Sequence, residues 1–154
     1  MKFVTMIFAI IMAGTVSAQE VKVDGLTFKI GDDVATVKTA LHTKLDPEKV
    51  DNGLPAPFNT GQSVLHLRTK GIWVFFNKKD TVTSIKFDEP YAGTIAGVKL
   101  GDSEKNVRAV LGKPVKAPWA FGTSQAFLYV LDDTAYVRFD IADADGVRAI
   151  YIQK

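Results

Sequence analysis

Hydrophobic and polar residues alternate in six short runs along the chain, and the runs fall into two groups of three. They are residues 64–68, 72–76 and 82–87, followed by residues 127–131, 135–141 and 147–152. Strict alternation is typical of strands that bury one face, and short polar turns separate the runs within each group. The pattern therefore predicts two three-stranded antiparallel meanders.

Apolar residues at helical spacing precede each group of strands. The first set is Val34, Val37, Leu41 and Leu45, and the second set is Val107, Val110 and Leu111. A Gly-Asp pair stands just before each set, at residues 31–32 and 101–102, and an Asp or a Ser comes next. Such side chains accept hydrogen bonds from the free amides of a first helical turn. We therefore expect one amphipathic helix before each meander.

The two halves of this pattern also resemble each other in sequence. Residues 28–41 align without gaps with residues 98–111, and five of the fourteen positions are identical. Two shorter blocks, each within a predicted strand, repeat in the same order, so the three blocks together predict a tandem repeat. We expect a single α+β domain at residues 19–154, with repeats at about 20–89 and 90–154. Each repeat would be a helix plus a three-stranded meander, with the helices packed on one face of the sheet.

The first eighteen residues have the order of a secretory signal peptide. Lys2 precedes an almost wholly apolar run at residues 3–12, and Val16-Ser17-Ala18 places small residues at a cleavage site. The apolar run is too short to span a bilayer. The chain has no cysteine, so no lipid can be attached at the cleavage site. We expect a periplasmic protein cleaved near Ala18, with no membrane insertion after cleavage.

Charge and composition narrow the class of partner. The chain has 19 Lys and Arg against 17 Asp and Glu, which gives a net charge of +2. A nucleic-acid binder normally shows a larger basic excess, so we expect no nucleic acid. Hydrophobic residues make up 47% of the chain, too many for a disordered protein.

The position of Arg138 indicates which face of the sheet the helices cover. Tyr136 and Arg138 alternate with apolar residues in the run 135–141, and arginine is rarely buried. By the repeat, Trp73 and Phe75 take the same face as Arg138. The face without helices is then expected to carry aromatic and basic residues and no acidic one: His66, Arg68, Trp73, Phe75, Lys86, Phe127, Tyr129, Tyr136, Arg138 and Tyr151.

This composition predicts a surface that binds a protein partner. Trp, Tyr and Arg dominate the residues that contribute most to protein–protein affinity. The candidate partner-binding residues on the sheet are Trp73, Phe75, Tyr129, Tyr136, Arg138 and Tyr151. The alternative is that a loop or the other repeat covers these aromatic side chains.

The residues that could support catalysis form no recognisable constellation. His42 and His66 fall on different elements, and no Ser has a nucleophile motif around it. The aspartates near residues 140–145 lack the spacing of a calcium loop. The missing cysteines exclude thiolate zinc sites and Cys nucleophiles. We therefore expect no enzyme, no metal site and no cofactor.

Residues 97–114 carry a resemblance to a known superfamily. The segment Gly-Val-Lys-Leu-Gly-Asp-Ser-Glu-Lys-Asn-Val-Arg-Ala-Val-Leu-Gly-Lys-Pro resembles the helix motif of proteins with the fold of the β-lactamase inhibitory protein. Outer-membrane assembly lipoproteins of the SmpA/OmlA type share that motif. The resemblance implies a duplicated helix and small antiparallel sheet. The assembly lipoproteins differ because they carry one unit and a lipidated Cys.

Three further segments resemble small bacteriocin and toxin immunity proteins. They are Asn52-Gly-Leu-Pro55, Lys70-Gly-Ile-Trp-Val-Phe-Phe76 and Leu111-Gly-Lys-Pro114. Immunity proteins neutralise a toxin by binding it and have no catalysis of their own. With the expected signal peptide, the resemblance implies an inhibitor or immunity protein that blocks an enzyme or toxin acting on the cell envelope. The alternatives are a non-enzymatic assembly or structural factor of the envelope, and a carrier of small molecules.

Inhibitors of this kind often insert a loop into the cleft of their target, and two segments are candidates for such a loop. The first is residues 54–59, and the second is residues 118–122, which contain Trp119 and Phe121. Exposed aromatic residues are unusual in a plain linker. The alternative is that Trp119 and Phe121 close one end of the core.

Overall fold

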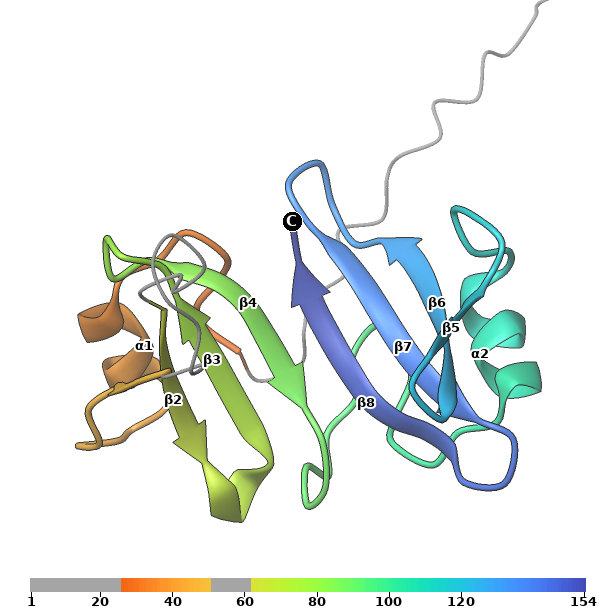
Figure 1. Cartoon of the computed structure of the whole chain (residues 1–154), viewed down its shortest axis with the longest axis horizontal. Coiled ribbons are helices and arrows are strands. Elements are labelled where there is room, and N and C mark those ends of the chain that lie inside the picture. Colours follow the sequence, from red (N-terminus) through yellow and green to blue (C-terminus); the bar gives the residue numbers. More distant parts are fainter. Residues whose placement is uncertain (1–25, 51–61) are drawn as a thin grey trace, which may run out of the picture.

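The computed structural model describes residues 26–50 and 62–154, which form one antiparallel sheet of eight strands (Figure 1). The strands are β1 (Glu48–Lys49), β2 (Ser63–Leu67), β3 (Ile72–Phe76), β4 (Val82–Phe87), β5 (Trp119–Phe121), β6 (Ser124–Val130), β7 (Tyr136–Ala142) and β8 (Gly146–Gln153). The helices are α1 (Val34–Ala40) and α2 (Glu104–Leu111), and a short 3-10 turn, η1, covers Arg68–Lys70. The expected signal peptide and the candidate loop at residues 54–59 lie outside the described residues.

The strand order across the sheet is β1-β2-β3-β4-β8-β7-β6-β5, so two meanders join through β4 and β8. At this junction Ile85 lies opposite Ile152, and Phe87 lies opposite Ile150. The expectation of one continuous sheet is therefore confirmed. Within residues 26–50 and 62–154, no helix has the length and apolar character needed to cross a bilayer.

The predicted α+β fold of two helix-plus-three-strand repeats is wrong. The structure is mainly a single antiparallel sheet, and its helices have only seven and eight residues. They lie at opposite ends of the sheet and do not form a layer over it (Figure 1). The edge strands β1 and β5 were not predicted, because both are very short and each directly follows a proline, Pro47 before β1 and Pro118 before β5.

The first helix ends one turn earlier than its apolar spacing predicts. His42 has φ 51°, and the amide of Thr43 donates to the carbonyl of Lys38 at 3.0 Å. The amide of His42 donates to the carbonyl of Thr39 at 3.2 Å, which completes a Schellman ending. Leu45, the expected fourth apolar position of this helix, is therefore 54% exposed.

The Lys-x-Gly-Asp segments at residues 29–32 and 99–102 make matching hydrogen bonds. In each, the Asp carboxylate accepts from the Lys amide, at 2.8 and 2.9 Å. The Gly amide donates to the carbonyl of a valine near the start of a strand, Val82, the first residue of β4, at 2.9 Å and Val147, the second residue of β8, at 2.8 Å. Each of these valine amides donates back to the Asp carbonyl, at 2.8 and 2.9 Å. The shared motif therefore anchors the start of each helix to the start of β4 or β8.

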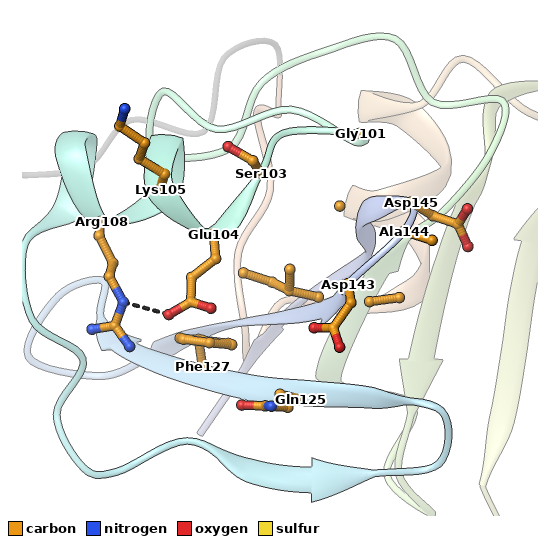
Figure 2. Close-up of a pocket in the computed structure, with 13 residues that line it drawn as sticks. Gly101, Ser103, Glu104, Lys105, Arg108, Gln125, Phe127, Asp143, Ala144 and Asp145 are labelled. Atoms are coloured by element: carbon orange, nitrogen blue, oxygen red, sulfur yellow. Dashed lines mark hydrogen bonds and ion pairs between the residues drawn. The ribbon is translucent and has the colours of Figure 1, made fainter.

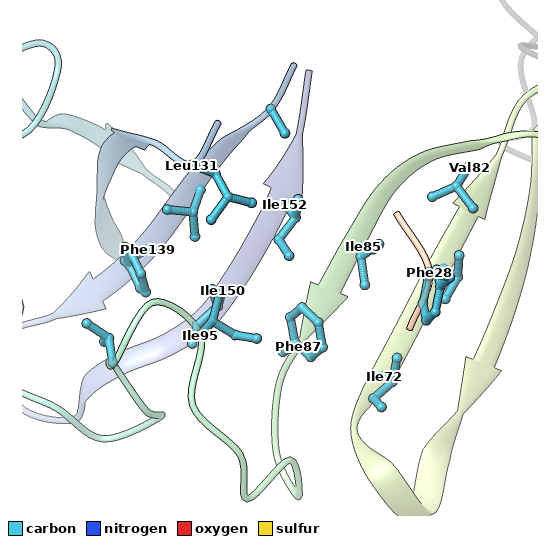
Figure 3. Close-up of a cluster of buried hydrophobic side chains, with 14 of the residues drawn as sticks. Phe28, Ile72, Val82, Ile85, Phe87, Ile95, Leu131, Phe139, Ile150 and Ile152 are labelled. Atoms are coloured by element: carbon cyan, nitrogen blue, oxygen red, sulfur yellow. The ribbon is translucent and has the colours of Figure 1, made fainter. Parts of the chain in front are cut away.

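One hydrophobic core runs under the whole sheet and crosses the junction between the meanders. Phe87, Ile95 and Ile150 are fully buried and lie together where β4 meets β8 (Figure 3). Each helix contributes one fully buried side chain to this core, Val37 from α1 and Val107 from α2. The core therefore holds the two meanders together, and it leaves the opposite face of the sheet, called the outer face below, without helices.

Candidate functional site

A row of side chains crosses the outer face from β2 to β5. The strand register places His66 opposite Trp73, Trp73 opposite Lys86, and Lys86 opposite Tyr151. Tyr151 lies opposite Arg138 on β7. Phe121 reaches this line from β5, since its ring lies 4.4 Å from the guanidinium carbon of Arg138. We call these six residues the stacked row: His66, Trp73, Lys86, Tyr151, Arg138 and Phe121.

Each cation of the stacked row lies between two aromatic rings. The Nζ of Lys86 is 5.0 Å from the centroid of Trp73 and 6.0 Å from that of Tyr151. The guanidinium carbon of Arg138 is 4.0 Å from the centroid of Tyr151, with Phe121 on its other side. Contacts within about 6 Å are attractive because the ring face is electron-rich, and each contributes about 0.5–2 kcal/mol. The rings and cations therefore hold one another in fixed positions.

The β2 end of the row is an imidazole stacked on an indole. The ring centroids of His66 and Trp73 are 3.3 Å apart, and their planes differ by 16°. The Nδ1 of His66 is buried and has no hydrogen-bond partner among the described residues. Burial lowers the pKa of His66, and the positive charge of Arg68 acts in the same direction. The imidazole is therefore neutral at pH 7 and contributes an aromatic surface, with no charge.

Two carboxylates also lie on the outer face, which corrects the expectation that this face has no acidic residue. The Oδ2 of Asp88 is 2.7 Å from the Nζ of Lys86, and its Oδ1 accepts from the Nε1 of Trp73 at 3.0 Å. The Oδ1 of Asp140 is 3.0 Å from the Nε of Arg138, and its Oδ2 accepts from Nη2 at 3.2 Å. Both cations of the stacked row are therefore neutralised within the chain.

The ion pair of Arg138 and Asp140 is nearly buried. Asp140 is 5% exposed, and the side chain of Arg138 is 12% exposed. Burial raises the pKa of Asp140, and the positive charge of Arg138 opposes this rise. Arg138, a predicted contact residue, therefore offers little free surface and lies between the rings of Tyr151 and Phe121.

The face predicted for β6 is wrong. Tyr129 and Phe127 were expected on the open face, but they are 5% and 1% exposed and belong to the core. They lie opposite Val137 and Phe139 on β7, which both point into the core, while Leu128 lies opposite Arg138. The ring of Tyr129 packs edge-on against Phe139 at 5.9 Å. This candidate site residue is therefore a core residue, and its burial raises the pKa of the Tyr129 hydroxyl.

The other candidate residues lie on strands of the sheet. Trp73, Phe75 and Tyr151 are half-buried, and Tyr136 is 40% exposed. Trp119 and Phe121 form β5, so the predicted loop at residues 118–122 is a strand and a tight turn. Phe121 is 47% exposed, and Lys116 lies over the Trp119 ring with its Nζ 4.1 Å from the centroid. Sequence reasoning missed Val130, which neighbours Tyr136 across the strands and is 59% exposed.

A separate hollow of about 690 Å³ lies between the start of α2, β6 and the turn that joins β7 to β8 (Figure 2). Phe127 forms part of its wall, and the guanidinium carbon of Arg108 lies 5.2 Å from the centroid of that ring. The Nε of Arg108 is 2.7 Å from the Oε1 of Glu104 (Figure 2). No group of three His, Cys, Asp or Glu side chains able to hold a metal ion occurs in residues 26–50 and 62–154.

Comparisons with known proteins give little further information. No protein-family model matches the chain, and no curated protein does either. Among solved structures, the chain is similar to a DUF4309 family protein, YjgB, from Bacillus subtilis, with a TM-score of 0.49 and 14% identity. The similarity covers 79% of this chain and 77% of that one. A likeness at this level carries no conclusion about function.

Proposed function

We propose that this protein is a non-catalytic binding protein that blocks an enzyme or toxin acting on the cell envelope. The outer face of the sheet would be its docking surface. The stacked row is the observation that carries the proposal, because it concentrates Trp, Tyr and Phe on the face that lacks helices. These residue types contribute most to protein–protein affinity.

The rigidity of the row favours binding. Lys86 and Arg138 are each held by two rings and one carboxylate, so the aromatic side chains beside them are already ordered. A surface that is ordered before association loses less conformational entropy when the partner docks. The more exposed residues Phe121, Val130 and Tyr136 lie at the β5–β7 end of the row and are the first candidates for direct contact.

The envelope location rests on the expected signal peptide at residues 1–18 and on the resemblance to exported immunity proteins. A purely structural role for the stacked row is the competing explanation. The two explanations predict different affinities. If the stacked row is purely structural, the removal of exposed ring atoms leaves the affinity for every partner unchanged.

The test is affinity capture followed by affinity measurement. The protein purified from its host is immobilised, exposed to envelope extract and culture supernatant, and the bound protein is identified by mass spectrometry. We expect one stoichiometric hydrolase or toxin, whose affinity falls by about 1 kcal/mol or more for each of Trp73→Ala and Tyr136→Ala. Leu45→Ala is the control, since Leu45 is also an exposed large hydrophobic residue but follows α1, away from the outer face.

Two results would contradict the proposal. A folded Tyr136→Ala variant with unchanged affinity would show that the outer face is not the docking surface. Capture of a set of outer-membrane components in place of one hydrolase or toxin would favour the assembly factor.

A further inference from the structure

The basic residues at the β5 end of the molecule lie in a segment that itself contains no acidic residue. Residues 105–131 contain Lys105, Arg108, Lys113 and Lys116 and no Asp or Glu. This segment covers most of α2 and all of β5 and β6. The segment therefore carries four positive charges between Glu104 and Asp132, although the whole chain is close to neutral.

Most of this charge is also unpaired in space. The Nε of Arg108 pairs with Glu104, the residue just before the segment, at 2.7 Å. Among the described residues, no carboxylate forms an ion pair with Lys105, Lys113 or Lys116. Lys86 and Arg138, by contrast, each have a carboxylate of this chain beside them. The lysines of the segment are free to pair with charges of another molecule.

The same end of the molecule carries most of the exposed apolar surface. Six large hydrophobic side chains are exposed in the described part of the chain, and five of them come from residues 110–136. They are Val110 (54%), Val115 (55%), Phe121 (47%), Val130 (59%) and Tyr136 (40%). Surface apolar residues scattered singly need no explanation, but contiguous exposed ones mark an interaction site, and Val130 and Tyr136 are direct neighbours across β6 and β7.

Strand pairing brings several of these side chains and the lysines together. The amide of Val115 donates to the carbonyl of Leu128 at 2.8 Å, which places the segment between Lys113 and Lys116 beside β6. Val130 is paired with Tyr136 across β6 and β7. An apolar centre with a charged rim is the usual anatomy of a protein interface.

We infer that the partner presents an acidic protein surface, with carboxylates around an apolar patch, to the end of the sheet formed by the α2–β5 connection, β5 and β6. This inference rests on the proposed function and names the chemistry of its partner. Charge complementarity is the reason for an acidic partner, since Lys113 and Lys116 lack counter-ions and flank Val115. A protein is favoured over a lipid surface because Phe121 is held against Arg138 on a rigid strand. An amphipathic helix that buries its apolar face in the bilayer is a common route to peripheral membrane binding, whereas Phe121 lies on a strand.

The test uses a charge-reversal variant and a matched control with the same change of charge. Lys113→Glu/Lys116→Glu reverses two charges beside β5, and Lys78→Glu/Lys79→Glu reverses two in the exposed β3–β4 turn. The first probe is poly-L-glutamate, and the second is vesicles of phosphatidylglycerol. We expect the wild type to bind poly-L-glutamate in a salt-sensitive manner. The first variant should bind about tenfold more weakly, while the control changes by less than about twofold.

Several outcomes would overturn the inference. If both double variants bind poly-L-glutamate equally weakly, only the net charge of the protein matters. If the wild type does not bind poly-L-glutamate, this end of the sheet does not bind acidic surfaces. Vesicle binding that exceeds poly-L-glutamate binding and is lost in Phe121→Ala would assign the surface to a lipid.

The captured partner separates the inference from the proposed function. If Tyr136→Ala weakens binding of the captured partner and Lys113→Glu/Lys116→Glu does not, the inference of an acidic partner surface is wrong, while the proposal that the outer face is the docking surface is retained. If neither variant changes the affinity, the docking face is wrong as well.

Discussion

Two glycines with the same backbone conformation provide a sharp test of how the outer face is supported. Gly71 follows η1 and has φ 62°, and Gly122 joins β5 to β6 and has φ 61°. Their surroundings differ completely. A Cβ at Gly71 would lie 2.0 Å from the carbonyl oxygen of Asp88 and 2.6 Å from the amide nitrogen of Tyr91, whereas a Cβ at Gly122 would meet nothing within 4 Å.

The expected cost of alanine at each position follows from these contacts. Both substitutions put an L-residue in the left-handed region, which costs about 1–2 kcal/mol. At Gly71 the clash is with backbone atoms that cannot rotate away, and overpacking of this kind adds about 1–3 kcal/mol. We therefore expect Gly71→Ala to destabilise the fold by about 1–3 kcal/mol more than Gly122→Ala does. Since the carboxylate of Asp88 holds Lys86 and Trp73, the shift would also disturb the stacked row.

The assay is urea unfolding followed by tryptophan fluorescence, with both variants compared to the wild type at the same m-value. The matched φ cancels the backbone contribution, so the difference between the two variants isolates the steric effect. Equal destabilisation would refute the reasoning, because it would show that Gly71 does not pack against the segment of Asp88 and Tyr91.

Three further predictions concern single side chains. Asp140→Leu/Arg138→Met should leave the free energy of unfolding in urea unchanged or raise it, because removing both partners also removes the cost of burying two charges. Burial raises the pKa of Asp140, so the folded state binds the proton of this carboxyl more tightly than the unfolded state does. The stabilisation that comes from protonated Asp140 is therefore present below the ordinary Asp pKa and is lost as the pH rises through the pKa of the folded state. Asp140→Asn should lack that pH dependence, and an unchanged pH profile would contradict the assignment. His42→Gly should raise stability by about 0.5–1 kcal/mol, since His42 has φ 51° at the end of α1, and a lower melting temperature would contradict this. Tyr129→Ala should destabilise the fold by about 3 kcal/mol, whereas Tyr136→Ala should leave the melting temperature within a few degrees of wild type, because only the first ring is in the core.

The bounds of β3 and β4 match their predicted runs, because short polar turns delimit both runs in the sequence. The buried face of a strand could be predicted where polar and apolar residues alternate, as in residues 136–140 of β7, but not in β6. In β6, residues 126–130 are Ala, Phe, Leu, Tyr and Val, so alternation gives no signal for the buried face. Only the pairing of Leu128 with Arg138 decides it, and that pairing is a property of the folded sheet.

The candidate site was predictable in its residue types and less so in its electrostatics. The sequence predicts Trp73, Tyr136 and Tyr151 on the outer face, because alternation and the repeat place them on the same face as Arg138. The same alternation places Asp140 on the outer face, so this carboxylate could have been found from the sequence. The cation–ring stacking could not, because it depends on how far Lys86, Arg138 and Phe121 reach between neighbouring strands.

Hydrogen–deuterium exchange of the protein alone and with its captured partner tests the central claim most directly, since it locates the bound surface without any substitution. The account predicts slower exchange at the β5–β6 and β6–β7 turns and along the exposed edge strand β5, with no change in α1 or the β3–β4 turn. Protection confined to α1 and the β1 edge, with the β5 end unchanged, would contradict docking on the outer face.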